Sequence, residues 1–204
     1  MVNVYSKARD GTRKLTRNFT VSEFACNDGA DKIFIDVDVV KNILQPIRRL
    51  TNKALVISSA YRTKEYNQKV GGASNSYHIL GRAFDIYSKA VDEVTLAKMC
   101  ELLGASGIGC YRTQHFVHCD NRINEYKWNV ISAGSIMTHS FASESIIKNV
   151  QSLLNYCYKK TNKKGYDCGQ VDGILGKRTV NAFRFFCLNN KYKRKQMRNI
   201  LRGD

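Results

Sequence analysis

Apolar residues recur at steps of three and four between Asp36 and Asn52, as they do along one face of a helix. Six residues form this stripe, which is typical of a helix packed on one side against a core: Val39, Val40, Ile43, Leu44, Ile47 and Leu50. Residues 91–103 repeat the pattern and are followed by Gly104, a favoured residue just after a helix end. We therefore predict two amphipathic helices in the first two thirds of the chain.

Short β-branched or aromatic runs lie between and after these helices, at 54–58, 83–87, 108–111 and 116–119. Such runs are typical of strands, and the last two are close enough to be joined by a polar turn. Thr20 and Glu23 have the spacing of a capping box, so a short helix is expected there. Residues 1–18 are polar and basic without periodicity, and we expect a loose arm. The pattern predicts an α+β fold with a small, mainly antiparallel sheet and flanking helices.

The pattern changes after the stretch 130–140, which has few large side chains and several Ser and Gly. Beyond it, apolar residues trace one helical face over 146–157 and another over 180–187. A length of 204 residues also exceeds the usual size of one domain. We predict a larger domain over 1–135 and a small helical domain over 141–204.

Charge is concentrated in the second part of the chain. Residues 141–204 hold 14 Lys and Arg against 4 Asp and Glu, a balance of +10 within a total of +16. Such a surface favours polyanionic partners, but no nucleic-acid-binding signature is present, so we expect no nucleic acid. In the segment 191–202, Met197, Ile200 and Leu201 have helical spacing among cations. This pattern fits a solvated helix end or contact with an anionic, partly apolar envelope surface.

The cysteines and the apolar runs bear on compartment. Seven cysteines without a Cys-x-x-Cys pair predict reduced thiols that act as small apolar residues. No apolar run approaches the roughly 20 residues that span a bilayer, and the first residues lack a signal-peptide core. We expect a protein made in the cytoplasm without a transmembrane segment.

Candidate chemistry lies in the stretch 76–85. His78 and Asp85 are good zinc-binding side chains, and Gly81 lets the backbone turn between them. A third ligand, His118, lies in a predicted strand beside the strand of Asp85. Two histidines, one carboxylate and an open fourth position are typical of a catalytic zinc site. We exclude Cys119 as a ligand because adjacent strand residues such as His118 and Cys119 point to opposite faces. The alternative for a lone histidine is a hydrogen-bonded structural role.

Several motifs occur in one order: Ser59-Ala60-Tyr61-Arg62-Thr63, Gly71-Gly72-Ala73, Ser76-x-His78-x-x-Gly81-x-Ala83-x-Asp85, Gly107-Ile108-Gly109 and Phe116-Val117-His118-x-Asp120. This set, covering roughly residues 15–128, resembles the zinc D-alanyl-D-alanine peptidase family of VanY-like carboxypeptidases and peptidoglycan endopeptidases, which includes many phage endolysins. The resemblance implies one zinc per chain, held by His78, Asp85 and His118. It also implies that Arg62 contacts the substrate carbonyl or its developing charge, with Tyr61 and Ser76 as candidate substrate contacts.

The general base is less well defined by the resemblance. Several relatives carry Asp or Glu three positions before the second histidine ligand, where this chain has His115. A neutral histidine could take or relay a proton at pH 7. However, His115 has the opposite strand parity to His118, whereas Asp120 shares its face. Asp120 could orient His118 or act on the water, and both candidates stay open.

The turn at 171–179, Val-Asp-Gly-Ile-Leu-Gly-x-x-Thr, resembles that of the small three-helix peptidoglycan-binding domain over about residues 143–190. It makes Asp172 and Gly173 candidate wall contacts. Together the resemblances imply a monomeric, endolysin-like peptidoglycan hydrolase that reaches the cell wall after release. It would cleave a stem-peptide or cross-bridge amide as an L-Ala-D-Glu or D-Ala-type endopeptidase. The alternatives are a D-Ala-D-Ala carboxypeptidase and a non-catalytic envelope-binding protein.

Overall fold

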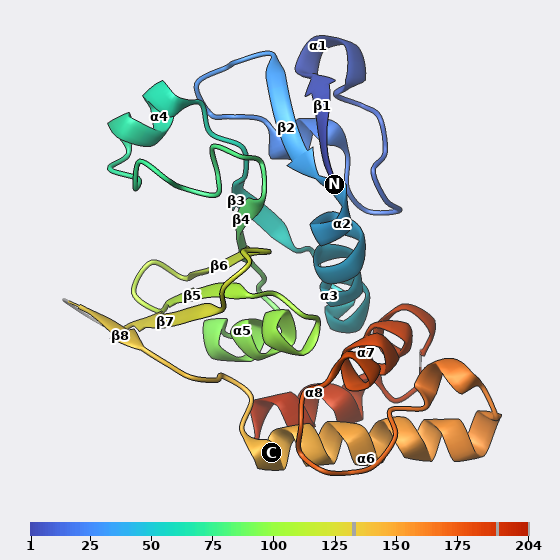
Figure 1. Cartoon of the computed structure of the whole chain (residues 1–204). Coiled ribbons are helices and arrows are strands. Elements are labelled where there is room, and N and C mark those ends of the chain that lie inside the picture. The colour runs from blue at the N-terminus through green and yellow to red at the C-terminus, as the bar shows by residue number, and fades with distance from the viewer. Residues whose placement is uncertain (132–133, 191, 204) are drawn as a thin grey trace.

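The computed structural model describes residues 1–131, 134–190 and 192–203. Its centre is a six-stranded sheet (Figure 1). In spatial order the strands are β3 (Val56–Ser59), β4 (Ala83–Tyr87), β6 (Phe116–Asp120), β5 (Gly107–Tyr111), β7 (Tyr126–Val130) and β8 (Ser135–Met137). The fold is α+β, as predicted.

The sheet is larger than predicted, and it is mixed. Four neighbouring pairs are antiparallel, but β5 and β7 run parallel, with Gly109 opposite Trp128. The parallel pair arises because the chain leaves β6 and crosses β5 before it forms the next strand. β7 and β8 were not predicted, although apolar and polar residues alternate along β7 from Tyr126 to Val130; β8 has only three residues.

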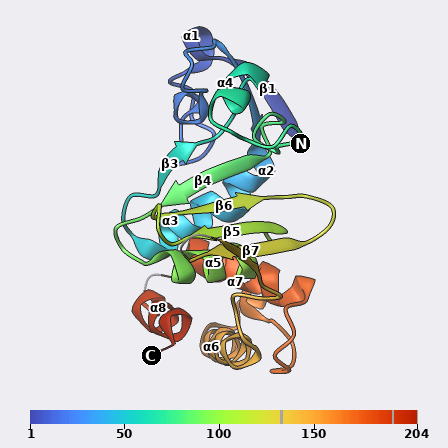
Figure 2. The ribbon, with the colours of Figure 1, turned by 90° about the vertical axis from the view of Figure 1, so that its left-hand side faces the viewer.

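Two helical segments cover one face of the sheet (Figure 2). The first is a continuous helix made of α2 (Val37–Val39), the π-helical turn η2 (Val40–Leu44) and α3 (Gln45–Thr51), and the second is α5 (Glu93–Leu102). Both were predicted from their apolar stripes. Strand side chains such as Phe84, Ile86, Val117 and Cys119 are fully buried in this core. The alternate residues of β4 and β6 therefore lie on the opposite face, where the candidate site is found.

The amino-terminal segment is ordered, so the prediction of a loose arm is wrong. β1 (Val2–Ser6) pairs antiparallel with β2 (Lys32–Asp36), and a short helix α1 (Lys7–Asp10) follows β1. The partner strand lies some 30 residues further along the chain, so local periodicity could not reveal the pairing. The predicted capping box is present: Glu23 accepts from the backbone N–H of Thr20 at the start of the 3₁₀ helix η1 (Val21–Phe24).

Glu101 on α5 fixes the connection to the carboxy-terminal helices. Its carboxylate accepts from the backbone N–H groups of Phe141 (2.7 Å) and Ala142 (2.8 Å), from Ser140, and from Lys127 Nζ (2.7 Å) on β7. Both charged side chains are nearly inaccessible to solvent. This buried ion pair therefore joins the helix α5, the sheet and the segment that leads into α6.

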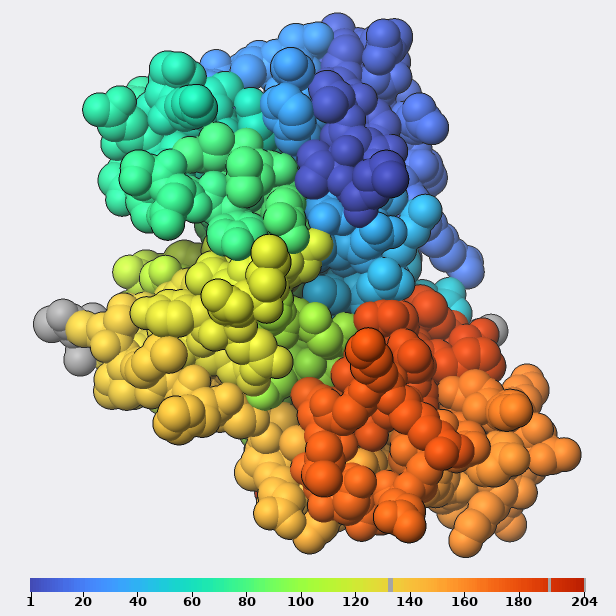
Figure 3. Space-filling view, viewed as in Figure 1, coloured from blue at the N-terminus to red at the C-terminus, as the bar shows by residue number. Residues whose placement is uncertain are grey.

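The carboxy-terminal part contains α6 (Glu144–Thr161), the 3₁₀ turn η3 (Lys164–Tyr166), α7 (Lys177–Asn189) and α8 (Arg194–Arg202). These helices pack directly beneath the first part of the chain (Figure 3). Arg184 on α7 donates to the carbonyl groups of Asn42 (3.1 Å) in η2 and of Leu103 (2.9 Å), the residue that caps the C-terminus of α5. The division into two domains stays a prediction, and residues 132–133 of its boundary, with Lys191 and Asp204, lie outside the described residues.

The basic end of the chain is part of this packing. Met197 and Leu201 of α8 are fully buried, while Arg198 donates to the carbonyl of Leu50 at 2.8 Å. The expectation that Met197 and Leu201 contact an envelope surface is therefore wrong, because the protein's own helices cover them. All seven cysteines are free and buried, as predicted for reduced thiols. In the described part of the chain, no helix is both long and apolar enough to cross a bilayer.

Candidate metal centre

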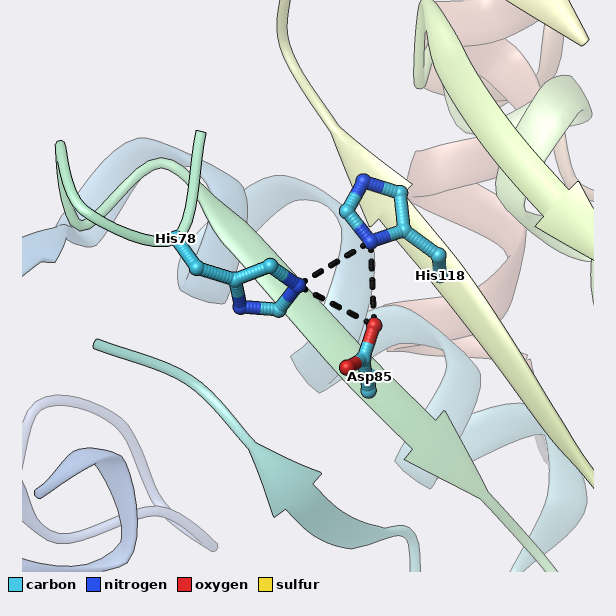
Figure 4. A group of neighbouring side chains, drawn as sticks. All are labelled: His78, Asp85 and His118. Atoms are coloured by element: carbon cyan, nitrogen blue, oxygen red, sulfur yellow. Dashed lines mark hydrogen bonds and ion pairs between the residues drawn. The ribbon is translucent and has the colours of Figure 1, made fainter. Parts of the chain in front are cut away.

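Three side chains converge on one point on the open face of the sheet (Figure 4). Asp85 is on β4, His118 is its cross-strand partner on β6, and His78 comes from the loop before β4. His78 Nε2 lies 3.1 Å from His118 Nδ1 and 3.2 Å from Asp85 Oδ1, and the last two atoms are 2.9 Å apart. All three residues are buried. The structure thus brings together the three predicted ligands.

The outer hydrogen bonds of the two histidines fix which nitrogens face this point. His78 Nδ1 donates to the carbonyl of Ala60 at 2.7 Å, and His118 Nε2 donates to Asp120 Oδ2 at 2.9 Å. In the neutral imidazole the other nitrogen of each ring then carries a lone pair. These two lone pairs and the Asp85 oxygen form a triangle of acceptors without a donor between them. Such a triangle is stable only around a proton or a cation.

The pKa values of His118 and Asp85 also indicate that the site favours a positive charge. Burial lowers the pKa of His118. The hydrogen bonds to Asp120 and Asp85 have the larger and opposite effect, so the pKa is raised to about 9. Burial also raises the pKa of Asp85, but the two histidines lower it well below its usual range. Without a cation the site retains a proton on His118.

A zinc ion fits the observed donor set. Zinc binds histidine nitrogen and carboxylate oxygen at about 2.0–2.2 Å, which places tetrahedral ligand atoms about 3.3–3.6 Å apart. The three observed separations, 2.9, 3.1 and 3.2 Å, are slightly shorter, so small side-chain shifts would admit the ion. The histidines already have the outer partners that orient metal ligands. Protein atoms supply three positions, so the fourth is free for a substrate or water.

Asp120 orients His118 from behind the cleft. Its carboxylate is fully buried, and besides His118 Nε2 it accepts from Nε and the backbone N–H of Arg122. Two strand glycines of the predicted motif make room for the surrounding side chains. A Cβ on Gly107 would lie 2.1 Å from the Asp120 carboxylate, and one on Gly109 would lie 2.3 Å from the ring of Trp128. The Gly-Ile-Gly motif is therefore explained by close approach of the centre's supporting side chains.

Arg62 contacts the opposite side of the centre. Its Nη2 donates to Asp85 Oδ2 at 2.7 Å, and its Nε donates to Ser59 Oγ at 2.8 Å. The guanidinium therefore holds the second ligand while it also lines the cleft. Ser76 Oγ accepts from the backbone N–H of His78 at 3.3 Å, which supports the loop that carries this ligand.

A cleft of about 530 Å³ opens in front of the three ligands. One wall is the loop 70–78, and the other carries aromatic side chains from β5, β6 and β7; a hollow separates these two parts in the space-filling view (Figure 3). Sequence reasoning did not find the residues that give the cleft its character: Tyr77, Tyr111, Phe116, Arg122, Tyr126 and Trp128. Their spacing in the sequence has no common period, because they belong to separate strands and loops.

Two predicted site residues lie away from the centre. His115 occupies the turn before β6, where its imidazole is mostly exposed and contacts Glu93 at 3.0 Å. It is not among the residues that line the cleft. Its φ of 58° shows that it is not in strand conformation, so the parity argument did not apply to it. Tyr61 is buried against Phe34 and does not line the cleft either.

Asp172 and Gly173 lie in the carboxy-terminal part, in the turn before α7. Asp172 Oδ1 accepts from Gln151 Nε2 at 2.8 Å and from the backbone N–H of Ile174 at 2.8 Å. The N–H of Gly173, whose φ is 80°, donates to Gln151 Oε1 at 2.9 Å. These groups therefore shape the turn and tie it to α6.

An α+β fold that presents two histidines and one carboxylate in a cleft has a side-chain set that could hold a metal ion, of the kind found in metal-dependent hydrolases. The sequence profile of peptidase M15 matches residues 17–120, about half of the chain and all of the centre. The chain belongs to the peptidase M15 family, whose members are zinc-dependent peptidases.

One curated relative is the Probable peptidoglycan L,D-endopeptidase MepK of Haemophilus influenzae. It is 34% identical over 76 residues, which cover 35% of this chain and 41% of the relative. The match thus spans about two fifths of the relative's length. No solved structure matches the chain.

Proposed function

We propose that this protein is a zinc-dependent peptidoglycan peptidase in which His78, Asp85 and His118 hold one metal ion. The observation that carries the proposal is the triangle of three acceptor atoms in a cleft. A bare triangle of this kind has no structural use, because acceptors repel one another unless a cation lies between them. Membership of the M15 family supports zinc as that cation.

Zinc, when bound, supplies a Lewis acid and a nucleophile at neutral pH. The protein's residues prepare the site for it. Asp120 holds His118 in the tautomer that presents Nδ1 to the centre. Arg62 holds Asp85 and brings a fixed positive charge to the cleft, where it stabilises the negative charge that develops on a cleaved amide.

Neither of the two predicted general bases, His115 and Asp120, offers a free proton acceptor in the cleft. His115 lies outside it, and the Asp120 carboxylate is engaged by His118 and Arg122. Asp120 therefore acts through His118, as a positioning residue. Of the two roles that the sequence left open for Asp120, orientation of His118 and action on the water, we propose the first.

For the bond that is cleaved, we favour the amide between L-Ala and D-Glu of the stem peptide. This bond joins an L residue to a D residue, and the name of the curated relative describes an L,D-endopeptidase. A D-Ala-type endopeptidase and a D-Ala-D-Ala carboxypeptidase are the alternatives within the class. Mass spectrometry of fragments from digested peptidoglycan distinguishes all three by the new amino and carboxyl ends.

For the carboxy-terminal part, we propose attachment to the cell wall, in an endolysin-like protein. A pocket of about 560 Å³ beside α8 supports contact with an anionic envelope polymer. Five cations line it (Lys53, Lys89, Lys195, Arg198 and Arg202), and among the described residues none of them forms a salt bridge. These cations replace the apolar side chains of α8 as the proposed contact, since the latter are buried.

The central test combines metal content with lysis. The purified protein should contain about one zinc per chain and should degrade purified wall until a chelator removes the metal. His78→Ala, Asp85→Ala and His118→Ala should each lose zinc and activity yet remain folded, because the apolar core is on the other side of the sheet. Wall degradation at the normal rate by any of these variants would refute the proposal, and a metal-free inactive protein would favour a non-catalytic binding role.

A further inference from the structure

Arg122 occupies an unusual position at the edge of the cleft. It is the second residue after β6, and its side chain is 22% exposed. Its guanidinium lies over three aromatic rings, 5.0 Å from the centroid of Tyr77 and 5.5 Å from those of Tyr126 and Trp128. All four residues line the same cleft as the metal ligands. A cation enclosed in this way has lost much of its hydration and is available for a charged partner.

The hydrogen bonds of Arg122 leave part of the group free. Nε donates to both oxygens of Asp120 at 2.9 and 3.1 Å, and Nη2 donates to Oδ2 of the same carboxylate. Nη1 has no partner among the described residues, yet it is not buried, so solvent reaches it. The Asp120 contacts hold the guanidinium plane fixed while Nη1 remains available to an acceptor.

The charges around the cleft favour an anion. Among the described residues that line it, the charged groups besides histidines are Arg62, Arg122 and Asp85. Arg62 compensates Asp85, and Arg122 compensates the buried Asp120. A divalent cation at the three ligands would leave the site with net positive charge. A negatively charged group on the substrate is therefore attracted to the cleft.

We propose that Arg122, within its cage of Tyr77, Tyr126 and Trp128, binds a free carboxylate of the stem peptide. The inference rests on the proposed function and names a feature of its substrate. The aromatic rings exclude water from the ion pair, which strengthens the pair, and they offer apolar walls to the neighbouring peptide atoms. Arg122 is thus a specificity residue, distinct from Arg62, which contacts a metal ligand.

The test uses a synthetic stem tetrapeptide and three versions in which one carboxylate is an amide. The amide replaces the D-Glu carboxylate, the diamino acid carboxylate or the terminal carboxylate. The wild-type protein should discriminate against one of these amides by about 10- to 100-fold in kcat/KM, as expected for loss of a charge-assisted pair. The affected version identifies which carboxylate Arg122 binds.

Arg122→Lys is the informative variant, because a lysine keeps a positive charge near the buried Asp120. It lacks the planar guanidinium, so it cannot donate to Asp120 and to a substrate carboxylate from one rigid group. With zinc added to saturation, its discrimination should fall below about threefold, mainly through KM for the free carboxylate. Arg82→Lys is the matched control. Arg82 also lies over Tyr77, at 5.4 Å, but it donates to Asn121 and does not line the cleft, so discrimination should be retained.

The result that overturns the inference is equal treatment of all four peptides by the wild-type protein, or unchanged discrimination in Arg122→Lys. Titration calorimetry with the same peptides gives an independent readout. If the protein binds the free carboxylate preferentially but cleaves nothing, the subsite stands and cleavage between L-Ala and D-Glu is excluded. If it cleaves all four peptides equally, the proposed function stands and the subsite fails.

Discussion

Replacing Asp120 by asparagine tests how the centre is held together. The substitution keeps the shape of the side chain but removes one acceptor oxygen and the negative charge. Asp120 is fully buried, and its partners on both sides, His118 Nε2 at 2.9 Å and Arg122 Nε at 2.9 Å, are donors. Oδ2 accepts from His118 and Arg122, and Oδ1 accepts from Arg122 alone. An asparagine keeps one acceptor oxygen, so its NH₂ group must face the donors that bind the other position.

The cost follows from these contacts. If the amide turns its NH₂ toward His118, the ring must take the other tautomer, and Nδ1 no longer offers a lone pair to the metal. Loss of an outer partner of this kind typically weakens metal affinity by 10- to 100-fold, or about 1.4–2.7 kcal/mol. If the NH₂ instead takes the place of Oδ1, it faces Nε and the backbone N–H of Arg122, and the guanidinium keeps an acceptor at Oδ2 but loses its charged partner, at about 1–3 kcal/mol of folding stability.

The assay is zinc competition against a chromophoric chelator, combined with thermal unfolding in excess chelator to isolate the metal-independent part. Asp120→Asn should show weaker zinc binding, a lower Tm in chelator, or both. For a chain of this size each kcal/mol corresponds to about 2–4 °C. Zinc affinity within twofold of wild type, together with an unchanged Tm, would refute the argument that Asp120 positions the ligand.

His115→Ala is the matched control for this experiment. The imidazole of His115 is 80% exposed and contacts Glu93 outside the cleft. Its removal should leave zinc affinity unchanged and alter stability by no more than about 0.5 kcal/mol. A large loss of turnover with normal zinc content would instead restore His115 as the general base.

Two further predictions concern the rest of the protein. Glu101→Gln should destabilise folding by about 3–5 kcal/mol, because Lys127 then loses its buried, charged partner. Glu125→Gln removes only an exposed partner of Lys127 and should cost less than about 1 kcal/mol. Chemical unfolding measures both effects, and equal values would contradict the reasoning. Replacing Lys53 and Lys195 together by glutamine should weaken envelope binding and its salt dependence without lowering Tm, because both line the basic pocket. Unaltered sedimentation with envelopes across a salt series would exclude that pocket as the contact.

Much of the scaffold was predictable because its signals are local. The helix over 37–51 follows from residue periodicity, which reflects burial of one face of a single element. The strand pair at 107–120 follows from two short apolar runs joined by a polar turn. Side-chain alternation placed His118 and Asp120 on one face, and the structure has them there, in contact at 2.9 Å. Residue chemistry and family motifs predicted His78, Asp85 and His118 as one set, and the structure places their ligand atoms within 4.8 Å of one another.

Long-range pairing was decided by the tertiary structure alone. The sequence of β1 contains no sign of its partner β2, and the crossing that makes β7 parallel to β5 depends on which strand edge is free after β6 forms. The aromatic cleft wall depends on that crossing, since it brings Trp128 beside Gly109.

The positions and contacts of individual polar groups also depend on the tertiary structure. The parity argument treated His115 as a strand residue, but a left-handed turn puts its imidazole outside the cleft. Arg122 had no sequence signal, because its function comes from three rings and one carboxylate that meet only in the folded chain. The sequence by itself determined which elements form and which side chains can bind a metal. Which strands pair and which side chains meet at the site were determined by packing between segments distant in the sequence. The free energy of that packing cannot be inferred from any local sequence pattern.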